Sequence, residues 1–191
     1  MKIILASTSP FRKEQLIQLG LKFKAVAPLF EEESFKMNSD LGAEQLCRLL
    51  GQKKCESLID LHKEDLIIGS DQMLVLEDKI LNKPKNLNEV TQRLTELNGK
   101  THTLLTSLFV YTAKKNFEHL DKTTLKMKNL SPEQIKDYAE LDRPIGCAGG
   151  YKFEKNGKNL FEQVISRDPS SIVGLPTLAL KDIIKENERD Q

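Results

Sequence analysis

The stretch KIILASTSPFRKEQL, residues 2–16, runs from an apolar segment straight into the start of a helix. KIILA (2–6) is aliphatic and β-branched, which predicts a buried strand. Ser9 and Pro10 are typical of a helix N-cap and first helical position, so we expect a helix over about 10–19. Its inward-facing side chains are predicted to be Leu16, Ile17 and Leu19.

The first turn of this helix carries Arg12 and Lys13. Acidic side chains are usual there, because a helix N-terminus has unpaired N–H groups and a partial positive charge. A bound anion would explain why basic residues stand where acidic ones are usual. Ser7, Ser9 and Arg12 would then converge with backbone donors on phosphate oxygens. The alternative is an ordinary capped helix with solvated basic side chains, and this stretch alone favours that alternative.

The remaining chain mixes predicted strands and helices. Strands are expected at 23–28, at LIIG (66–69), at MLVL (73–76) after a GSDQ interruption, and as a neighbouring antiparallel pair at 101–113 and 117–130. Helices are expected at 41–62, at 87–100 with an Asn98-Gly99 end, at 131–141 with a Ser131–Gln134 capping box, and at the C-terminus, with an acidic loop at 29–40. The pattern indicates an α/β or α+β fold with a mixed sheet, and with no linker or repeat we expect one domain over 1–191.

Composition narrows the class of protein. With 29 basic and 28 acidic residues, the chain has a net charge of +1 and no basic stripe, so we expect neither a nucleic-acid partner nor a membrane partner. The N-terminal apolar run is far too short for a signal peptide. Three cysteines without a C-x-x-C pair favour free thiols in a reducing compartment, so we expect a cytoplasmic protein.

Asp71, in GSDQ (69–72), directly follows an apolar strand. A charge there is costly unless it is paired, hydrogen-bonded or bound to metal, so Asp71 is a candidate general base or metal ligand. A turn aspartate that accepts backbone N–H bonds explains the same pattern.

Several other charged residues are weaker signals. Lys83 is held extended by the proline that follows it, and Lys53 lies on the polar face of the predicted helix 41–62, so either could bind phosphate. Isolated lysines are usually solvated, however. The acidic run 31–33 could supply a carboxylate to Mg²⁺, although a solvated loop is the simpler interpretation.

Other catalytic patterns are missing. The sequence has no G-x-x-x-x-G-K-[ST] motif, no G-x-G-x-x-G after a strand and no zinc-ligand spacing among its histidines. Cys147 could be a nucleophile, but no base partner can be identified, and a buried structural thiol is favoured.

Taken in order, the motifs L-A-S-x-S-P-x-R, E-E, K, G-S-D-Q, N-K-P, A-G-x-Y and I-V-G-L-P resemble those of the Maf family of nucleotide pyrophosphatases, over 3–180. The resemblance implies an α/β fold with a mixed sheet, of the Maf and ITPase kind, with two lobes around a central cleft and often a homodimer. It also implies metal-dependent hydrolysis of nucleoside triphosphates between the α- and β-phosphates, with Mg²⁺ or Mn²⁺ as cofactor and a house-cleaning role.

The resemblance implies roles for individual residues. Asp71 matches the proton acceptor that activates water and, together with Glu32, the metal ligands. The phosphate-binding positions are matched by Ser7, Ser9, Arg12, Lys13, Lys53 and Lys83. Lys13 replaces a usual arginine, Ser107 a common glycine and Lys54 a usual small residue.

Three residues point to the branch of the family that hydrolyses 7-methyl-GTP. These are Phe11, Gln72 and Glu154, the last in AGGYKFE where the dTTP and UTP branch has glutamine. N7-methylation makes guanine cationic, so it would gain a cation–π interaction on Phe11, and Glu154 could accept from its N1–H and 2-amino edge. The alternatives are a Maf enzyme that prefers dTTP, UTP or another modified nucleotide, and a non-catalytic, nucleotide-responsive regulator of cell division.

Overall fold

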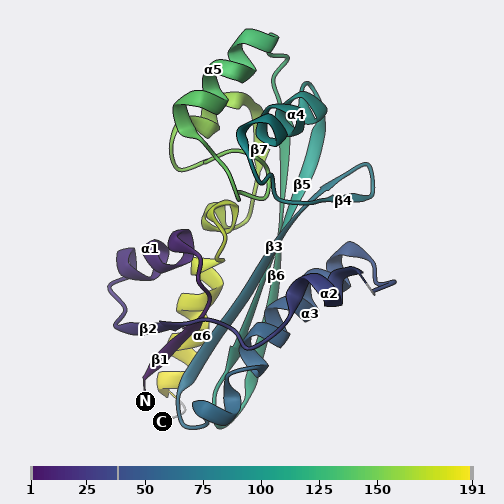
Figure 1. Cartoon of the computed structure of the whole chain (residues 1–191). Coiled ribbons are helices and arrows are strands. Elements are labelled where there is room, and N and C mark those ends of the chain that lie inside the picture. The colour runs from purple at the N-terminus through teal and green to yellow at the C-terminus, as the bar shows by residue number, and fades with distance from the viewer. Residues whose placement is uncertain (1, 38, 190–191) are drawn as a thin grey trace. The chain divides into compact units, whose positions relative to one another are not determined.

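The computed structural model describes residues 2–37 and 39–189 (Figure 1). Its helices are α1 (Pro10–Gln18), α2 (Glu32–Met37), α3 (Ala43–Glu56), α4 (Leu87–Leu97), α5 (Pro132–Asp142) and α6 (Thr177–Arg189), with short 3₁₀ turns η1 (Ile59–Leu61), η2 (Asn156–Leu160) and η3 (Pro169–Val173). Its strands are β1 (Ile3–Ala6), β2 (Phe23–Val26), β3 (Leu66–Leu76), β4 (Lys79–Leu81), β5 (Thr101–Tyr111), β6 (Asn116–Met127) and β7 (Phe161–Ile165). None of the helices in these ranges is both long and apolar enough to cross a membrane.

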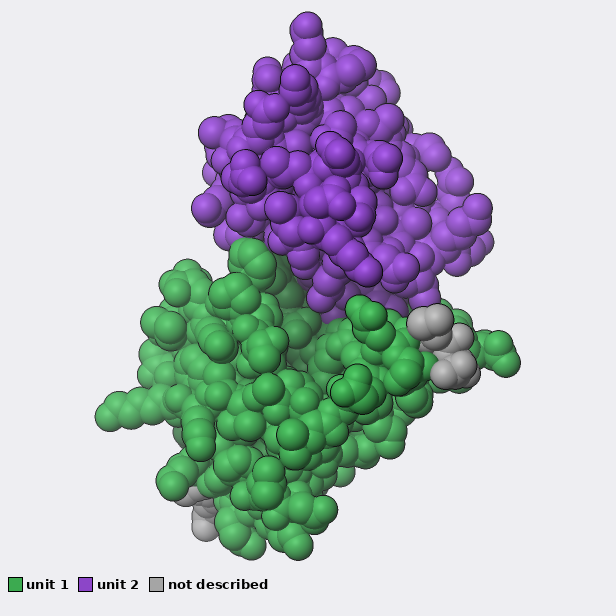
Figure 2. Space-filling view, viewed as in Figure 1, with its two compact units in different colours: residues 1–71, 106–121, 168–191 green, residues 72–105, 122–167 purple. Residues whose placement is uncertain are grey.

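The strands form one mixed sheet in the order β2-β1-β3-β5-β6-β7, with β4 paired to β3. β1 pairs in parallel with β2 and with β3. β4 pairs antiparallel with β3, and β7 pairs antiparallel with β6. The α/β class with a mixed sheet is therefore confirmed. The chain divides into two compact units, 1–71 with 106–121 and 168–191, and 72–105 with 122–167 (Figure 2).

In the first unit, both faces of the sheet are covered. Side chains of alternate residues reach opposite faces: Leu5 packs with Leu16 of α1 and Leu180 of α6, while Ile4 packs with Leu58, which follows α3. Double coverage explains why LIIG is apolar without alternation.

The α3 helix approaches the sheet very closely. A Cβ at Gly69 would lie 2.2 Å from the carbonyl oxygen of Gly51, and a Cβ at Gly51 would lie 2.5 Å from Oγ of Ser107. Both positions therefore need glycine, and this contact brings the buried face of α3 against the middle of β3 and β5.

The second unit is built on the other parts of β3, β5 and β6, with α4 and α5. Val90, Leu94 and Leu97 form the buried face of α4. The predicted capping box is confirmed, because Ser131 and Gln134 exchange hydrogen bonds at the start of α5. These local contacts fix where the helix begins.

Three local predictions are wrong, and one predicted helix ends earlier than expected. The expected loop 29–40 contains α2, and the expected helix 41–62 is α3 followed by a 3₁₀ turn. GSDQ does not interrupt the sheet, because β3 runs without a break over Leu66–Leu76. Ile17 is 59% exposed, since Arg12, Gln15 and Leu16 occupy the buried side of α1.

Candidate functional site

The start of α1 is a hydrogen-bonded turn that presents Arg12 inward. Ser9 is the N-cap and accepts from the backbone N–H of Arg12, while Oγ of Ser7 accepts from the N–H of Ser9 at 3.1 Å. The guanidinium of Arg12 donates from Nε to the carbonyl of Gly174 at 2.8 Å and also contacts Oγ of Ser7 at 3.5 Å. The basic residue at the helix start is therefore buried and oriented, not solvated.

Gly174 ties this turn to β3. Its carbonyl oxygen accepts from Arg12 and, at 3.0 Å, from Oγ of Ser70, which precedes Asp71. Gly174 has φ +127°, a conformation that L side chains rarely adopt. The glycine of I-V-G-L-P thus links Arg12 to the strand that carries Asp71.

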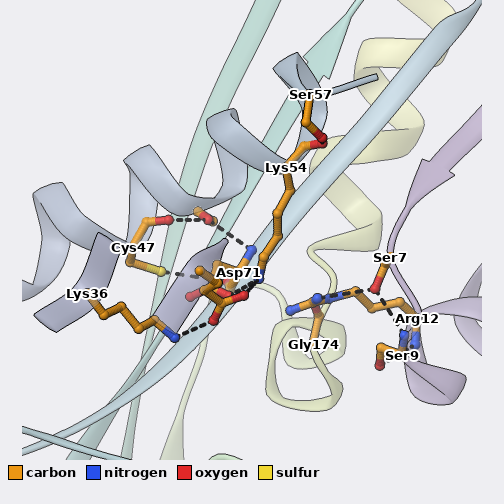
Figure 3. A network of polar contacts seen from close by, with 11 residues as sticks. Ser7, Ser9, Arg12, Lys36, Cys47, Lys54, Ser57, Asp71 and Gly174 are labelled. Atoms are coloured by element: carbon orange, nitrogen blue, oxygen red, sulfur yellow. Dashed lines mark hydrogen bonds and ion pairs between the residues drawn. The ribbon is translucent and has the colours of Figure 1, made fainter. Parts of the chain in front are cut away.

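Asp71 lies in the middle of β3 and is completely buried. Its Oδ1 lies 2.5 Å from Nζ of Lys54 on α3 (Figure 3), whereas Oδ2 is buried without a hydrogen-bond partner among the described residues. A buried carboxylate oxygen with no partner is energetically costly, and such sites are often functional. Asp71 can therefore accept a proton or ligate a cation through Oδ2.

The backbone of Asp71 is also held from two sides. Its N–H donates to Oγ of Ser107 at 3.1 Å, and that hydroxyl donates to the carbonyl of Cys47 at 2.7 Å. The thiol of Cys47 donates to the carbonyl of Asp71 at 3.6 Å. Burial and the nearby Asp71 carboxylate raise the pKa of Cys47 to about 12, so this thiol stays protonated.

Glu32, on α2, joins the same network. Its Oε2 lies 2.5 Å from Nζ of Lys54, and its Oε1 pairs with Lys36. Burial alone would raise the pKa of Glu32, but the ammonium groups of Lys54 and Lys36 lower it to about 2. Glu32 is therefore ionised at neutral pH.

The carboxylates Asp71 and Glu32 affect the pKa values of basic residues on both sides of the network, Arg12 on α1 and Lys36 on α2. Burial lowers the pKa of Arg12, although Asp71 and Glu32 act to raise it. The pKa of Lys36 is raised overall: burial opposes its charge, but Asp71 and Glu32 favour it. Cations and carboxylates from α1, α2, α3 and β3 thus form one network, which is buried at Arg12, Lys54 and Asp71 (Figure 3) and half-buried on α2.

The lysine beside Asp71 is Lys54, whereas the sequence analysis selected its neighbour Lys53 as a phosphate-binding residue. Lys53 pairs instead with Glu56 at 3.0 Å, and its side chain is 41% exposed. Lys54, with a side chain only 9% exposed, reaches Asp71 and Glu32. The missed signal was its spacing, because Lys54 is four residues from both Leu50 and Leu58 and so lies on the apolar stripe of the helix.

Two further predicted residues belong to the start of α1. Phe11 and Lys13 are both half-buried, on either side of the buried Arg12. Ser70, Lys36 and Ser107 belong to the Asp71 network but were not predicted as site residues.

Three predicted residues, Gln72, Lys83 and Glu154, lie in the second unit. Gln72 follows Asp71 on β3 and is half-buried, while Lys83 and Glu154 are exposed. Burial raises the pKa of Cys147 to about 11. Glu154 also raises this pKa, whereas Lys83 lowers it. Lys83 and Glu154 therefore both lie within electrostatic range of one thiol.

Glu32 and Asp71 offer donors that fit a hard divalent cation. Their carboxylates approach the same ammonium, and Oδ2 of Asp71 is buried without a hydrogen-bond partner among the described residues. No group of three or more His, Cys, Asp or Glu side chains suited to a metal is found in 2–37 and 39–189. Protein sites often hold Mg²⁺ through one or two carboxylates together with water and substrate phosphates, so a pair of carboxylates matches its usual protein ligands.

Comparison with known proteins gives full-length matches. The family model "Maf-like protein" matches residues 2–187. A "7-methyl-GTP pyrophosphatase" of Bdellovibrio bacteriovorus is 38% identical over 184 residues, which cover 96% of each chain. A protein of that name from Pseudoalteromonas atlantica is 38% identical over 192 residues, 100% of this chain and 97% of the other.

Among solved structures, a "Nucleoside-triphosphatase / dITP/XTP pyrophosphatase" from Mycobacterium abscessus matches with a TM-score of 0.43 and 13% identity, over 66% of this chain and 74% of that one. This similarity is too low to support an argument about function.

Proposed function

Because the chain belongs to the Maf family, we propose that it is a nucleoside triphosphate pyrophosphatase that converts 7-methyl-GTP to 7-methyl-GMP and pyrophosphate. The observation that carries the proposal is Asp71, which is buried, faces Lys54 through one oxygen and has no hydrogen-bond partner for the other among residues 2–37 and 39–189. A protein that only bound nucleotides would not need a buried carboxylate with a free oxygen. The activity after which the two relatives are named supports the choice of 7-methyl-GTP as substrate.

In the proposed reaction, Oδ2 of Asp71 accepts a proton from the attacking water. The water oxygen bonds to the α-phosphorus as the α–β phosphoanhydride bond breaks, so that the nucleoside monophosphate carries the new oxygen and pyrophosphate is the leaving group. Lys54 takes the phosphate-binding role that we expected of Lys53, because its ammonium is the one beside Asp71. Arg12, with Ser7 and Ser9 at the helix start, would bind phosphate oxygens.

Glu32 and Asp71 would hold the divalent cation. When bound, Mg²⁺ or Mn²⁺ neutralises charge on the phosphates. Lys54 keeps the two carboxylates close together and compensates their charge within the buried cluster. In the second unit, Lys83 would bind phosphate, while Glu154 and Gln72 would read the base.

The proposed substrate and the cysteine thiols of the protein indicate the compartment in which it acts. We place it in the cytoplasm, where nucleotides are abundant and where the thiols of Cys47, Cys55 and Cys147 would stay reduced. The homodimer expected from the resemblance stays a prediction.

The test is release of pyrophosphate from a panel containing 7-methyl-GTP, GTP, dTTP and UTP, with and without Mg²⁺ or Mn²⁺. We expect the highest kcat/KM for 7-methyl-GTP and no turnover in chelator. A preference for dTTP or UTP would contradict the substrate. Tight binding without any pyrophosphate release would contradict the enzyme and favour a nucleotide-responsive regulator.

A further inference from the structure

Two loops of the second unit carry residues to which the proposed function gives a substrate contact. One loop is 82–84, which contains Lys83, and the other is the glycine-rich segment 146–157, which contains Glu154. Both side chains are exposed, and each lies in a segment without a strand to support it. Something else in the unit must therefore set the distance between these two loops.

Arg93, on α4, contacts both loops. Its Nη1 donates to the carbonyl of Asn82 at 2.8 Å and lies 3.3 Å from the carbonyl of Ala148. The Arg93 side chain is only 12% exposed, and of its two hydrogen bonds the one to Ala148 is partly buried whereas the one to Asn82 lies at the exposed edge. One guanidinium nitrogen thus bridges the residue before Lys83 and the loop of Glu154.

The surroundings of Arg93 are shaped to this bridge. A Cβ at Gly150 would lie 3.1 Å from Cγ of Arg93, and Gly150 has φ +69°, so this position favours glycine on both counts. The N–H of Gly146 donates to the carbonyl of Pro84 at 2.8 Å, a second link between the same loops.

Both ends of the bridge are anchored. The buried face of α4, with Val90 and Leu94, fixes the backbone of Arg93. On the glycine-rich loop, the hydroxyl of Tyr151 lies 2.9 Å from Nε2 of the buried His102. The bridge therefore connects a rigid helix to a loop that is itself pinned three residues before Glu154.

We propose that Arg93 is a positioning residue for substrate selection: it clamps the Lys83 loop to the Glu154 loop, so that phosphate and base contacts keep a fixed separation. The inference rests on the proposed function. Arginine suits this role because its planar, permanently charged fork can serve two carbonyl acceptors at once. Arg93 itself need not touch the nucleotide.

Three variants test the clamp. Arg93→Met keeps an unbranched stem for packing but removes the donors, Arg93→Lys keeps the charge and one donor group, and Glu96→Gln is the matched control. Glu96 pairs with Nε of Arg93 at 3.4 Å on the exposed side, so its loss leaves the contacts to Asn82 and Ala148 intact. The readout is the ratio of kcat/KM for 7-methyl-GTP to that for dTTP, because dTTP lacks the donor pair of the guanine edge and a reduced fraction of folded enzyme cannot change a ratio.

We expect Arg93→Met to lower this ratio about tenfold, mainly through KM, in line with the loss of charge-assisted hydrogen bonds. Arg93→Lys should recover part of the preference, and Glu96→Gln should keep all of it. Combining Arg93→Met with Glu154→Gln should add little to either change, because both act on one contact.

Different experimental results would overturn the clamp and the proposed function. A wild-type protein without 7-methyl-GTP hydrolysis overturns the proposed function. A wild-type nucleotide preference in Arg93→Met, or an equal loss in Glu96→Gln, overturns the clamp.

Discussion

Nζ of Lys54 lies 2.5 Å from Oδ1 of Asp71 and the same distance from Oε2 of Glu32. One buried cation thus compensates two carboxylates that come from different elements. Removing Lys54 leaves the buried carboxylate of Asp71 without its ion pair, and such a loss costs more than the pair itself contributes to stability. The cluster therefore makes the candidate site sensitive to substitutions that leave the rest of the fold intact.

The first prediction concerns Asp71. Asp71→Asn keeps the shape of the side chain but cannot accept the proton of the attacking water, so pyrophosphate release should fall by about 10²- to 10⁴-fold. Nucleotide binding, measured by calorimetry with 7-methyl-GTP, should persist. Full turnover in this variant would show that another residue is the base.

The second prediction separates two adjacent lysines. Lys54→Ala leaves Asp71 and Glu32 without their shared cation, so the free energy of unfolding should fall by about 3–5 kcal/mol and activity should be lost. Lys53→Ala removes an exposed pair with Glu56 and should change stability by less than about 1 kcal/mol. Urea unfolding and pyrophosphate release on both variants provide the comparison, and equal effects would contradict the assignment of Lys54.

The third prediction concerns acid stability. The pKa of Glu32 is about 2 in the folded protein against an ordinary 4.5, so its ion pairs stabilise the fold above about pH 4.5. That contribution should disappear as the pH falls from 4.5 toward 2, because the unfolded chain binds the proton first.

Glu32→Gln should therefore lower stability at pH 7 and weaken its dependence on pH across the acidic window, as measured by unfolding at several pH values. The matched control is Glu33→Gln, which changes the exposed neighbouring position on α2. Parallel curves for Glu32→Gln and wild type would argue against the folded-state ion pairs.

The fourth prediction concerns recognition of the base. Glu154→Gln replaces an acceptor of two donors with an amide, so the preference for 7-methyl-GTP over dTTP should fall by about tenfold or more. Competition between the two nucleotides in one reaction measures this directly. An unchanged preference would remove Glu154 from base recognition and leave Phe11 and Gln72 as the proposed readers.

Local signals in the sequence predicted the elements well. Ser9 and Pro10 start α1 as expected, and the Ser131–Gln134 capping box starts α5, because cap hydrogen bonds join residues only a few positions apart. The ordered motifs predicted the Maf family, which the comparisons confirm. They also marked Arg12, Glu32 and Asp71, which the structure brings into one network.

By itself, the sequence determined the α/β class, the family and the residue types that the chemistry needs. Only the tertiary structure decided that Lys54 and not Lys53 faces Asp71, that 29–40 contains a helix, and that Arg93 bridges two loops. The reason is physical: a buried charge is stable only beside its partner, and those partners lie on distant elements. Glu32 meets Lys54 through the packing of α2 near α3, and no local pattern in 29–40 encodes that contact.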